Sequence, residues 1–128
     1  MTVALILGSV AVALAALVHV YIFVLESVRW MQPSTWRVFG IRDHEQAETL
    51  RPMAYNQGFY NLFLALGAIA GLVLLWSDAP GGRTLALFAS ACMAAAAAVL
   101  LTTGSGYLRA AIVQGTLPLI GFVLLLFA

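Results

Sequence analysis

Four apolar stretches, each close to the length that crosses a lipid bilayer, constrain this chain more than any other feature. They cover about residues 3–25, 58–76, 84–103 and 107–127. A transmembrane helix needs about 20 apolar residues, and in lipid only a helix or a closed barrel satisfies every backbone hydrogen bond. Charged residues make up 9% of the chain, whereas soluble domains carry about 25%. The sequence therefore predicts an all-α integral membrane protein.

The short connections between the later stretches predict how the helices are arranged. Residues 77–83 form a tight polar turn, and residues 104–106 read Gly-Ser-Gly, which is typical of a hairpin tip. Such short connections make the helices that they join antiparallel neighbours. We therefore expect residues 1–128 to form a single transmembrane domain, folded as a four-helix bundle.

The connection between the first two stretches, residues 27–57, is the one long polar segment. Pro33 indicates a helix start, with Ser34 or Thr35 as the N-cap, and Pro52 is expected to interrupt the helix. Apolar residues lie among the charged ones between the two prolines, namely Trp36, Val38, Phe39, Ile41, Ala47 and Leu50. This pattern favours a short amphipathic helix lying in the headgroup plane. The predicted fold is thus a membrane four-helix bundle with an interfacial amphipathic helix in its first loop.

The arginines predict the orientation of the bundle in the membrane. With four spans, one side carries only Arg83, and the other side carries Arg29, Arg37, Arg42, Arg51 and Arg109. Cytoplasmic loops hold an excess of positive residues. We therefore expect a multi-pass protein of the cell inner membrane, with both termini outside and the long first loop in the cytoplasm. A net charge of +1 argues against a nucleic-acid partner, and membrane lipid is the expected partner.

Small residues predict close helix packing. Gly67 and Gly71 form a GxxxG pair, and residues 94–98 are an unbroken alanine run. In lipid, helices associate through small residues that let their backbones approach. The pattern does not distinguish packing within the chain from packing between copies, so a homo-oligomer stays open.

Two ionisable residues mark a candidate site at the end of the first stretch. His19 lies inside it and Glu26 follows it directly. A separation of seven residues places both on one face of an α-helix, about 10 Å apart along its axis, and Trp30 is expected to continue that face one turn later. An ionisable group at membrane depth is costly and indicates a functional site.

Polar residues of the other helices are predicted at the same cytoplasmic end. Gln57 and Asn61 are four residues apart, Tyr107 and Gln114 are seven apart, and each pair shares a helix face. Lipid offers no hydrogen bonds, so these groups either satisfy one another or line a water-filled cavity. The candidate ligand-binding residues are His19, Glu26, Trp30, Gln57, Tyr60, Asn61, Tyr107, Arg109 and Gln114.

Each of these residues also has a purely structural interpretation. The amides can join helices by hydrogen bonds, each worth about 0.6 kcal/mol in membranes. Tyrosine and tryptophan are common at the membrane interface. Arg109 can reach the interface or pair with Glu26. The convergence of the whole set is the stronger observation.

Three kinds of chemistry can be considered for this set of residues. His19 and Glu26 are candidate catalytic residues, because a histidine and a carboxylate can exchange protons with a substrate. A metal site is not expected, since zinc needs three or four ligands and the chain has only two histidines and no CxxC or HExxH motif. A pocket for an amphipathic ligand is the third. No phosphate-binding loop, nucleophile elbow or dinucleotide fingerprint is present, so enzymatic activity and any cofactor stay undetermined.

Three segments resemble one known family. They are residues 19–26 with Trp30, residues 56–61, which read Asn-Gln-Gly-Phe-Tyr-Asn, and residues 104–107 with Gln114 and Pro118. They are similar to the signatures of small bacterial and fungal membrane proteins catalogued as domain of unknown function 1304. The resemblance implies a four-helix membrane protein and supplies no activity. It implies that six residues belong to the signature as a set: His19, Glu26, Gln57, Asn61, Tyr107 and Gln114.

The leading hypothesis from the sequence is a small membrane protein that binds a small or lipid-like ligand in a cytoplasm-side polar pocket. The first alternative is a structural subunit or assembly factor of a membrane complex, in which the polar groups hold the helices together. The second is transport of a proton or small solute, which would require an oligomer because four helices are few and no inverted repeat is visible.

Overall fold

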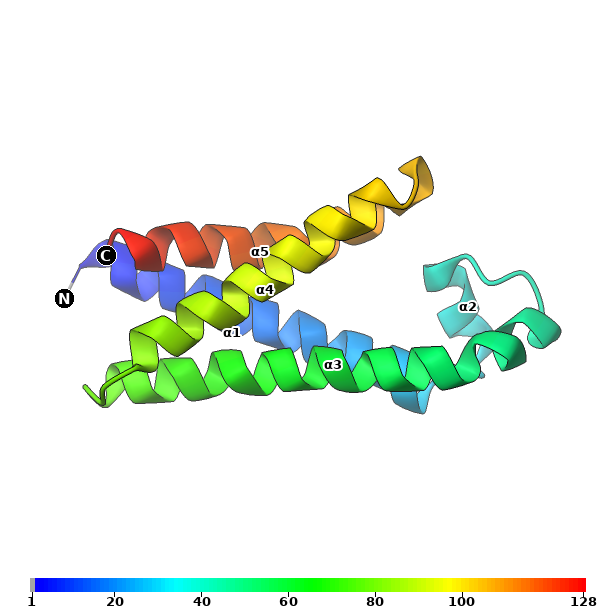
Figure 1. Cartoon of the computed structure of the whole chain (residues 1–128), viewed down its shortest axis with the longest axis horizontal. Helices are drawn as coiled ribbons and strands as arrows, with labels where there is room; N and C mark the ends of the chain where they lie inside the picture. The colour runs from blue at the N-terminus through cyan, green and yellow to red at the C-terminus, as the bar shows by residue number, and fades with distance from the viewer. Residues whose placement is uncertain (1) are drawn as a thin grey trace. The chain divides into compact units, whose positions relative to one another are not determined.

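The computed structural model describes residues 2–128, which are mainly helical and contain no strand (Figure 1). Seven helical elements follow one another within these residues. In chain order they are α1 (Val3–Phe23), the π-helical turn η1 (Val24–Val28), α2 (Pro33–Phe39), α3 (His44–Trp76), α4 (Gly82–Thr102), the 3-10 turn η2 (Ser105–Tyr107) and α5 (Leu108–Leu126).

Four of the described helices are long and apolar enough to cross a membrane. They are Val3–Val28, His44–Trp76, Gly82–Thr102 and Ser105–Leu126. The prediction of an all-α protein with four membrane-spanning helices is thereby confirmed, and the chain is a multi-pass membrane protein. The single transmembrane domain over residues 1–128 stays a prediction.

The first span ends in a π-helical turn, which the sequence pattern did not indicate. In η1 the amide of Arg29 donates to the carbonyl of Val24 at 2.8 Å, so the donor lies five positions after the acceptor. A π turn contains one residue more than an α turn and is often found at functional sites. The helix ends at Val28, and Trp30 lies in the following turn. The prediction that Trp30 continues the helical face was therefore wrong.

The first loop contains a short helix. α2 covers Pro33–Phe39, its N-cap is Gln32, and Pro33 occupies the first turn. The predicted caps Ser34 and Thr35 were wrong because proline fits the first helical position, where no N–H is needed. α2 ends at Gly40, which adopts the left-handed conformation (φ 68°) that glycine tolerates best.

α3 begins at His44, much earlier than the predicted start of the second span at residue 58, and runs through Pro52. The prediction that Pro52 interrupts this helix was wrong. Proline removes one backbone hydrogen bond, and the rest of this 33-residue helix continues on both sides of it.

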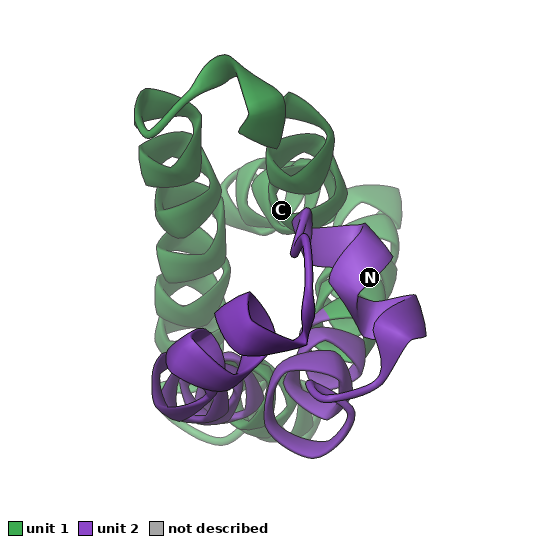
Figure 2. Cartoon of the chain, turned by 90° about the vertical axis from the view of Figure 1, so that its right-hand side faces the viewer, with its two compact units in different colours: residues 1–18, 64–128 green, residues 19–63 purple. Residues whose placement is uncertain are grey.

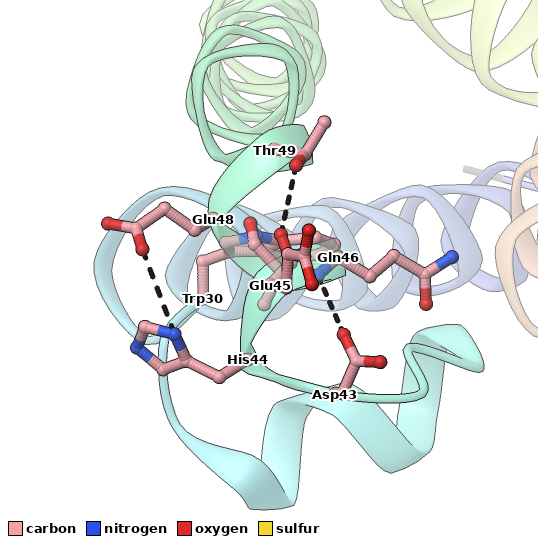
Figure 3. A network of polar contacts seen from close by, with 8 residues as sticks. Trp30, Asp43, His44, Glu45, Gln46, Glu48 and Thr49 are labelled. Carbon is pink, nitrogen blue, oxygen red and sulfur yellow. Dashed lines mark hydrogen bonds and ion pairs between the residues drawn. The ribbon is translucent and has the colours of Figure 1, made fainter.

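Polar contacts support the early start of α3 (Figure 3). The amide of Gln46 donates to Asp43 Oδ1 at 2.8 Å, and the Gln46 side chain accepts from the amide of Arg42 at 2.8 Å. These bonds satisfy amides that a helix start leaves free. Thr49 Oγ1 donates to the Glu45 carbonyl at 2.9 Å, and His44 Nδ1 lies 3.7 Å from Glu48 Oε2.

The chain divides into two compact units, residues 1–18 with 64–128 and residues 19–63, which we call unit 1 and unit 2 (Figure 2). In unit 1 the contacts between helices form a closed ring, because α1 packs on α5 and α3, and α4 packs on α3 and α5. The glycine and hydrogen-bond contacts that define this ring join Gly8 to Leu125, Ser9 to Trp76, Gly71 to Ala86 and Gly115 to Ala97.

The two glycines of the GxxxG pair play different roles in unit 1. A Cβ at Gly71 would overlap the backbone of Ala86, lying 2.8 Å from its Cα and in closer contact with its amide nitrogen. A Cβ at Gly67 would meet only Ala89 Cβ, at 3.8 Å. The close approach of the α3 and α4 backbones at this pair therefore depends on Gly71 and does not involve Gly67.

Two polar side chains tie the helices of unit 1 at the end where α3 and α5 finish. Trp76 Nε1 donates to Ser9 Oγ at 3.0 Å. Arg83, near the start of α4, donates to the Leu125 carbonyl at 3.0 Å and to the Ala128 carbonyl at 2.7 Å. A helix C-terminus leaves carbonyls without partners, and the arginine supplies donors for those of α5.

Candidate functional site

Unit 2 is built on a close contact between η1 and α3. Gly58 of α3 faces Ser27, and a Cβ at this position would overlap Ser27 Oγ. The absence of a side chain lets Ser27 Oγ donate to the carbonyl of Tyr55 at 2.8 Å. The rings of Phe23 and Phe59 meet edge to face nearby, with centroids 5.1 Å apart. These contacts hold the turn that carries Glu26 against α3.

Trp30 links the other elements of unit 2. It is buried, and its Nε1 donates to the carbonyl of Ala47 on α3 at 2.8 Å. Its carbonyl accepts from Trp36 Nε1 of α2 at 2.8 Å, and its ring lies 5.4 Å from that of Phe39. Trp30 therefore anchors η1, α2 and α3 together.

A cavity of about 150 Å³ lies beside η1, and all of its lining residues belong to unit 2. Its polar lining comes from η1, the turn after it and α3: Glu26, Ser27, Trp30, Gln32, Arg51 and Tyr55. Pockets for drug-sized ligands usually exceed about 300 Å³. This one has room for a small polar group.

Glu26 is the unusual member of this lining. Its side chain is 7% exposed, and within residues 2–128 its Oε2 has no hydrogen-bond partner. It also lacks an ion pair, because His44–Glu48 is the one ion pair of the described chain. A buried polar atom without a partner costs about 1–3 kcal/mol, and more when it is charged. Such a group is expected to take a donor from a ligand or from water.

Arg51 and Tyr55 also line the cavity, although the sequence analysis did not select them. They are four residues apart on α3 and so share a helix face. The signal was present in the sequence but was hidden by the prediction that α3 starts at residue 58. An arginine carries five N–H donors and a tyrosine one O–H, so these two side chains can donate hydrogen bonds to an anionic group in the cavity.

Of the other predicted site residues in unit 2, none except Trp30 lines this cavity. His19 is 2% exposed. Asn61 is buried, and its Nδ2 donates to the backbone carbonyl of Gln57 at 3.2 Å, whereas the side chains of Gln57 and Tyr60 are exposed. The predicted role of these four residues in binding stays a prediction.

The three predicted site residues of the last helix lie in unit 1. Tyr107 closes η2 and is exposed, Arg109 lies in the first turn of α5 and is exposed, and Gln114 is half-buried one to two turns later. Their convergence with the residues of unit 2, including the pair of Arg109 with Glu26, stays a prediction.

The titratable side chains of the described residues do not gather as metal ligands usually do. Residues 2–128 contain no group of three or more His, Cys, Asp or Glu side chains that could hold a metal ion. The cavity that Glu26 lines also has arginine, tyrosine, tryptophan and glutamine side chains in its lining.

Comparison with known protein families gives one result for this chain. The family model described as "Protein of unknown function (DUF1304)" matches residues 13–126, which include η1 and every helix that contributes to the cavity. No curated protein and no solved structure matches the chain. Because the matched region covers nearly the whole sequence, the chain belongs to the DUF1304 family of proteins of unknown function.

Proposed function

We propose that this membrane protein binds a small or lipid-like ligand in the polar cavity around Glu26, in the cytoplasmic half of the membrane. The observation that carries this proposal is the environment of Glu26 on the π turn η1. Its Oε2 is buried without a hydrogen-bond partner among residues 2–128, and Glu26 lines a cavity together with Arg51 and Tyr55. Unsatisfied buried polar groups and π turns both recur at functional sites.

The lining favours a zwitterionic head group. Glu26 can accept hydrogen bonds from an ammonium group, and Arg51 can donate to a phosphate. Glu26 lies within the span Val3–Val28, near its end, which is the depth of lipid head groups. An aminophospholipid such as phosphatidylethanolamine combines both charges, and the excess of arginines on this side supports a cytoplasmic location.

The proposal is binding rather than catalysis. An acid–base reaction by His19 and Glu26 would require both residues at one substrate, and the lining of the cavity includes Glu26 but not His19. The cavity by itself therefore supports only the carboxylate as a ligand-binding group.

The test is native mass spectrometry of the purified full chain, titrated with phosphatidylethanolamine or phosphatidylcholine of the same acyl composition. Phosphatidylcholine has the same charges but no N–H donor, so preference for phosphatidylethanolamine is expected. Glu26→Gln should weaken phosphatidylethanolamine binding roughly tenfold, because hydrogen bonds to charged groups are worth about 1.5–3 kcal/mol. Glu48→Gln is the matched control, since Glu48 is exposed on α3 and does not line the cavity.

Equal binding by the Glu26 and Glu48 variants would refute the proposal. The same spectra report oligomeric state and bound proteins. A stoichiometric protein partner together with no bound lipid would instead favour the structural subunit, in which the polar groups serve assembly.

A further inference from the structure

Unit 2 contains a second cavity, of about 320 Å³, on a different set of residues. Its polar lining comes from the end of α1, the residue after η1 and the start of α2, and it consists of Tyr21, Arg29, Ser34 and Thr35. No residue of this lining belongs to the lining of the Glu26 cavity. The two cavities are therefore separate candidate sites.

Thr35 gives the lining of this cavity a buried hydroxyl without a hydrogen-bond partner in residues 2–128. Its side chain is 1% exposed, and its Oγ1 has no hydrogen-bond partner in residues 2–128. A helical threonine can usually donate to a carbonyl of the preceding turn, but Thr35 lies in the first turn of α2, where the chain before it is not helical. A buried hydroxyl without a partner is destabilising, so a binding partner for it would be favourable.

Arg29 supplies the charge of the cavity. It is the first residue after the span Val3–Val28, its side chain is exposed, and it takes part in no ion pair of the described chain. None of the residues that line the cavity is an aspartate or glutamate. The polar lining therefore offers a cation and hydroxyl donors, and its charge selects an anion.

The rest of the lining is apolar. Val24, Leu25 and Val38 complete the wall, and Tyr21 lies one turn before Val24 on the membrane-spanning helix. A soluble anion would leave this wall unused, whereas an acyl chain beside the head group would cover it. The position of Arg29 at the membrane end of the span places the charge at head-group depth.

We infer that this second cavity binds the phosphate head group of an anionic phospholipid, with Arg29 and the hydroxyls of Ser34 and Thr35 as donors. The acyl chain lies along the wall formed by Val24, Leu25 and Val38. Unlike the Glu26 cavity, this site has no carboxylate to pair with an ammonium group, so it prefers phosphatidylglycerol to zwitterionic lipids.

The test uses the full chain in detergent and native mass spectrometry with phosphatidylglycerol, with phosphatidylcholine of the same acyl chains, and with inorganic phosphate as a competitor. Arg29→Gln should weaken phosphatidylglycerol binding roughly five- to tenfold, as expected for one arginine at the lipid surface. Arg37→Gln is the matched control, because Arg37 is exposed on α2 and does not line the cavity. It should leave the affinity unchanged.

Thr35→Val separates a binding role of the hydroxyl from a structural one. The variant keeps the branched shape and removes an oxygen that has no partner in residues 2–128. It should weaken phosphatidylglycerol binding and should raise the thermal midpoint of the lipid-free protein. A lowered lipid-free midpoint with unchanged binding would overturn the assignment of Thr35.

Three results would overturn the inference as a whole. One is equal affinity for phosphatidylglycerol and phosphatidylcholine. Another is an equal loss of binding in the Arg29 and Arg37 variants, which would indicate general surface charge rather than a site. The last is full competition by inorganic phosphate, which would identify a soluble anion as the occupant in place of a lipid. Failure of Glu26→Gln to affect phosphatidylethanolamine binding would leave this inference untouched.

Discussion

Substituting alanine at each glycine of the GxxxG pair should have opposite effects on stability. At Gly71 the new Cβ would lie 2.8 Å from the Cα of Ala86 and closer still to its amide nitrogen. Both obstacles are backbone atoms, so α3 and α4 must separate. At Gly67 the same methyl group would meet one side-chain carbon, Ala89 Cβ, at 3.8 Å, which is an ordinary contact.

The magnitudes follow from two opposing terms. Overpacking in a well-packed interior costs about 1–3 kcal/mol, and contact with backbone places Gly71→Ala at the upper end of that range. Alanine is better than glycine in a helix by about 1 kcal/mol. Gly71→Ala is therefore expected to lower the free energy of unfolding by about 2 kcal/mol, whereas Gly67→Ala should raise it by up to about 1 kcal/mol.

The assay is reversible unfolding of the purified protein in mixed micelles, with sodium dodecyl sulfate as denaturant and helix content as the signal. Oligomeric state is measured on the same samples. Equal stability of the two variants would refute the assigned roles of the glycines. A change of oligomeric state in Gly71→Ala, without loss of helix stability, would show that the glycine packs between copies rather than on Ala86.

Two further predictions concern unit 2. Trp30→Phe keeps an aromatic ring but removes the 2.8 Å hydrogen bond to the carbonyl of Ala47. The free energy of unfolding should therefore fall by about 1–3 kcal/mol. An unchanged unfolding curve would show that this bond does not hold Trp30 to α3. Pro52→Ala restores a backbone N–H inside α3, and the variant should gain up to about 3 kcal/mol of stability. A gain seen together with lower hydrogen exchange of residues 44–56 would support a continuous helix, and a loss of stability would contradict it.

The membrane-spanning architecture could be predicted from the sequence because the hydrocarbon thickness fixes the length of an apolar helix. The turn at residues 77–83 and the hairpin tip at residues 104–106 could be predicted because glycine and proline favour turns. The structure places helix boundaries there. Glu26 could also be selected from sequence alone, since an ionisable group at the end of an apolar run is rare. The buried position of Glu26 agrees with that selection.

The surroundings of Glu26 were decided by tertiary structure. Periodicity assumes an unbroken α-helix, but the helix becomes a π turn after Phe23 and ends at Val28, so Trp30 lies outside it. Pro52 was read as a breaker from local propensity, yet α3 continues through it. The cap at the start of α3 supports the helix before that proline, and the Ser27–Tyr55 hydrogen bond supports the helix after it. Arg51 and Tyr55 line the Glu26 cavity because α3 continues through Pro52 and packs on η1 at Gly58 and through the Ser27–Tyr55 bond.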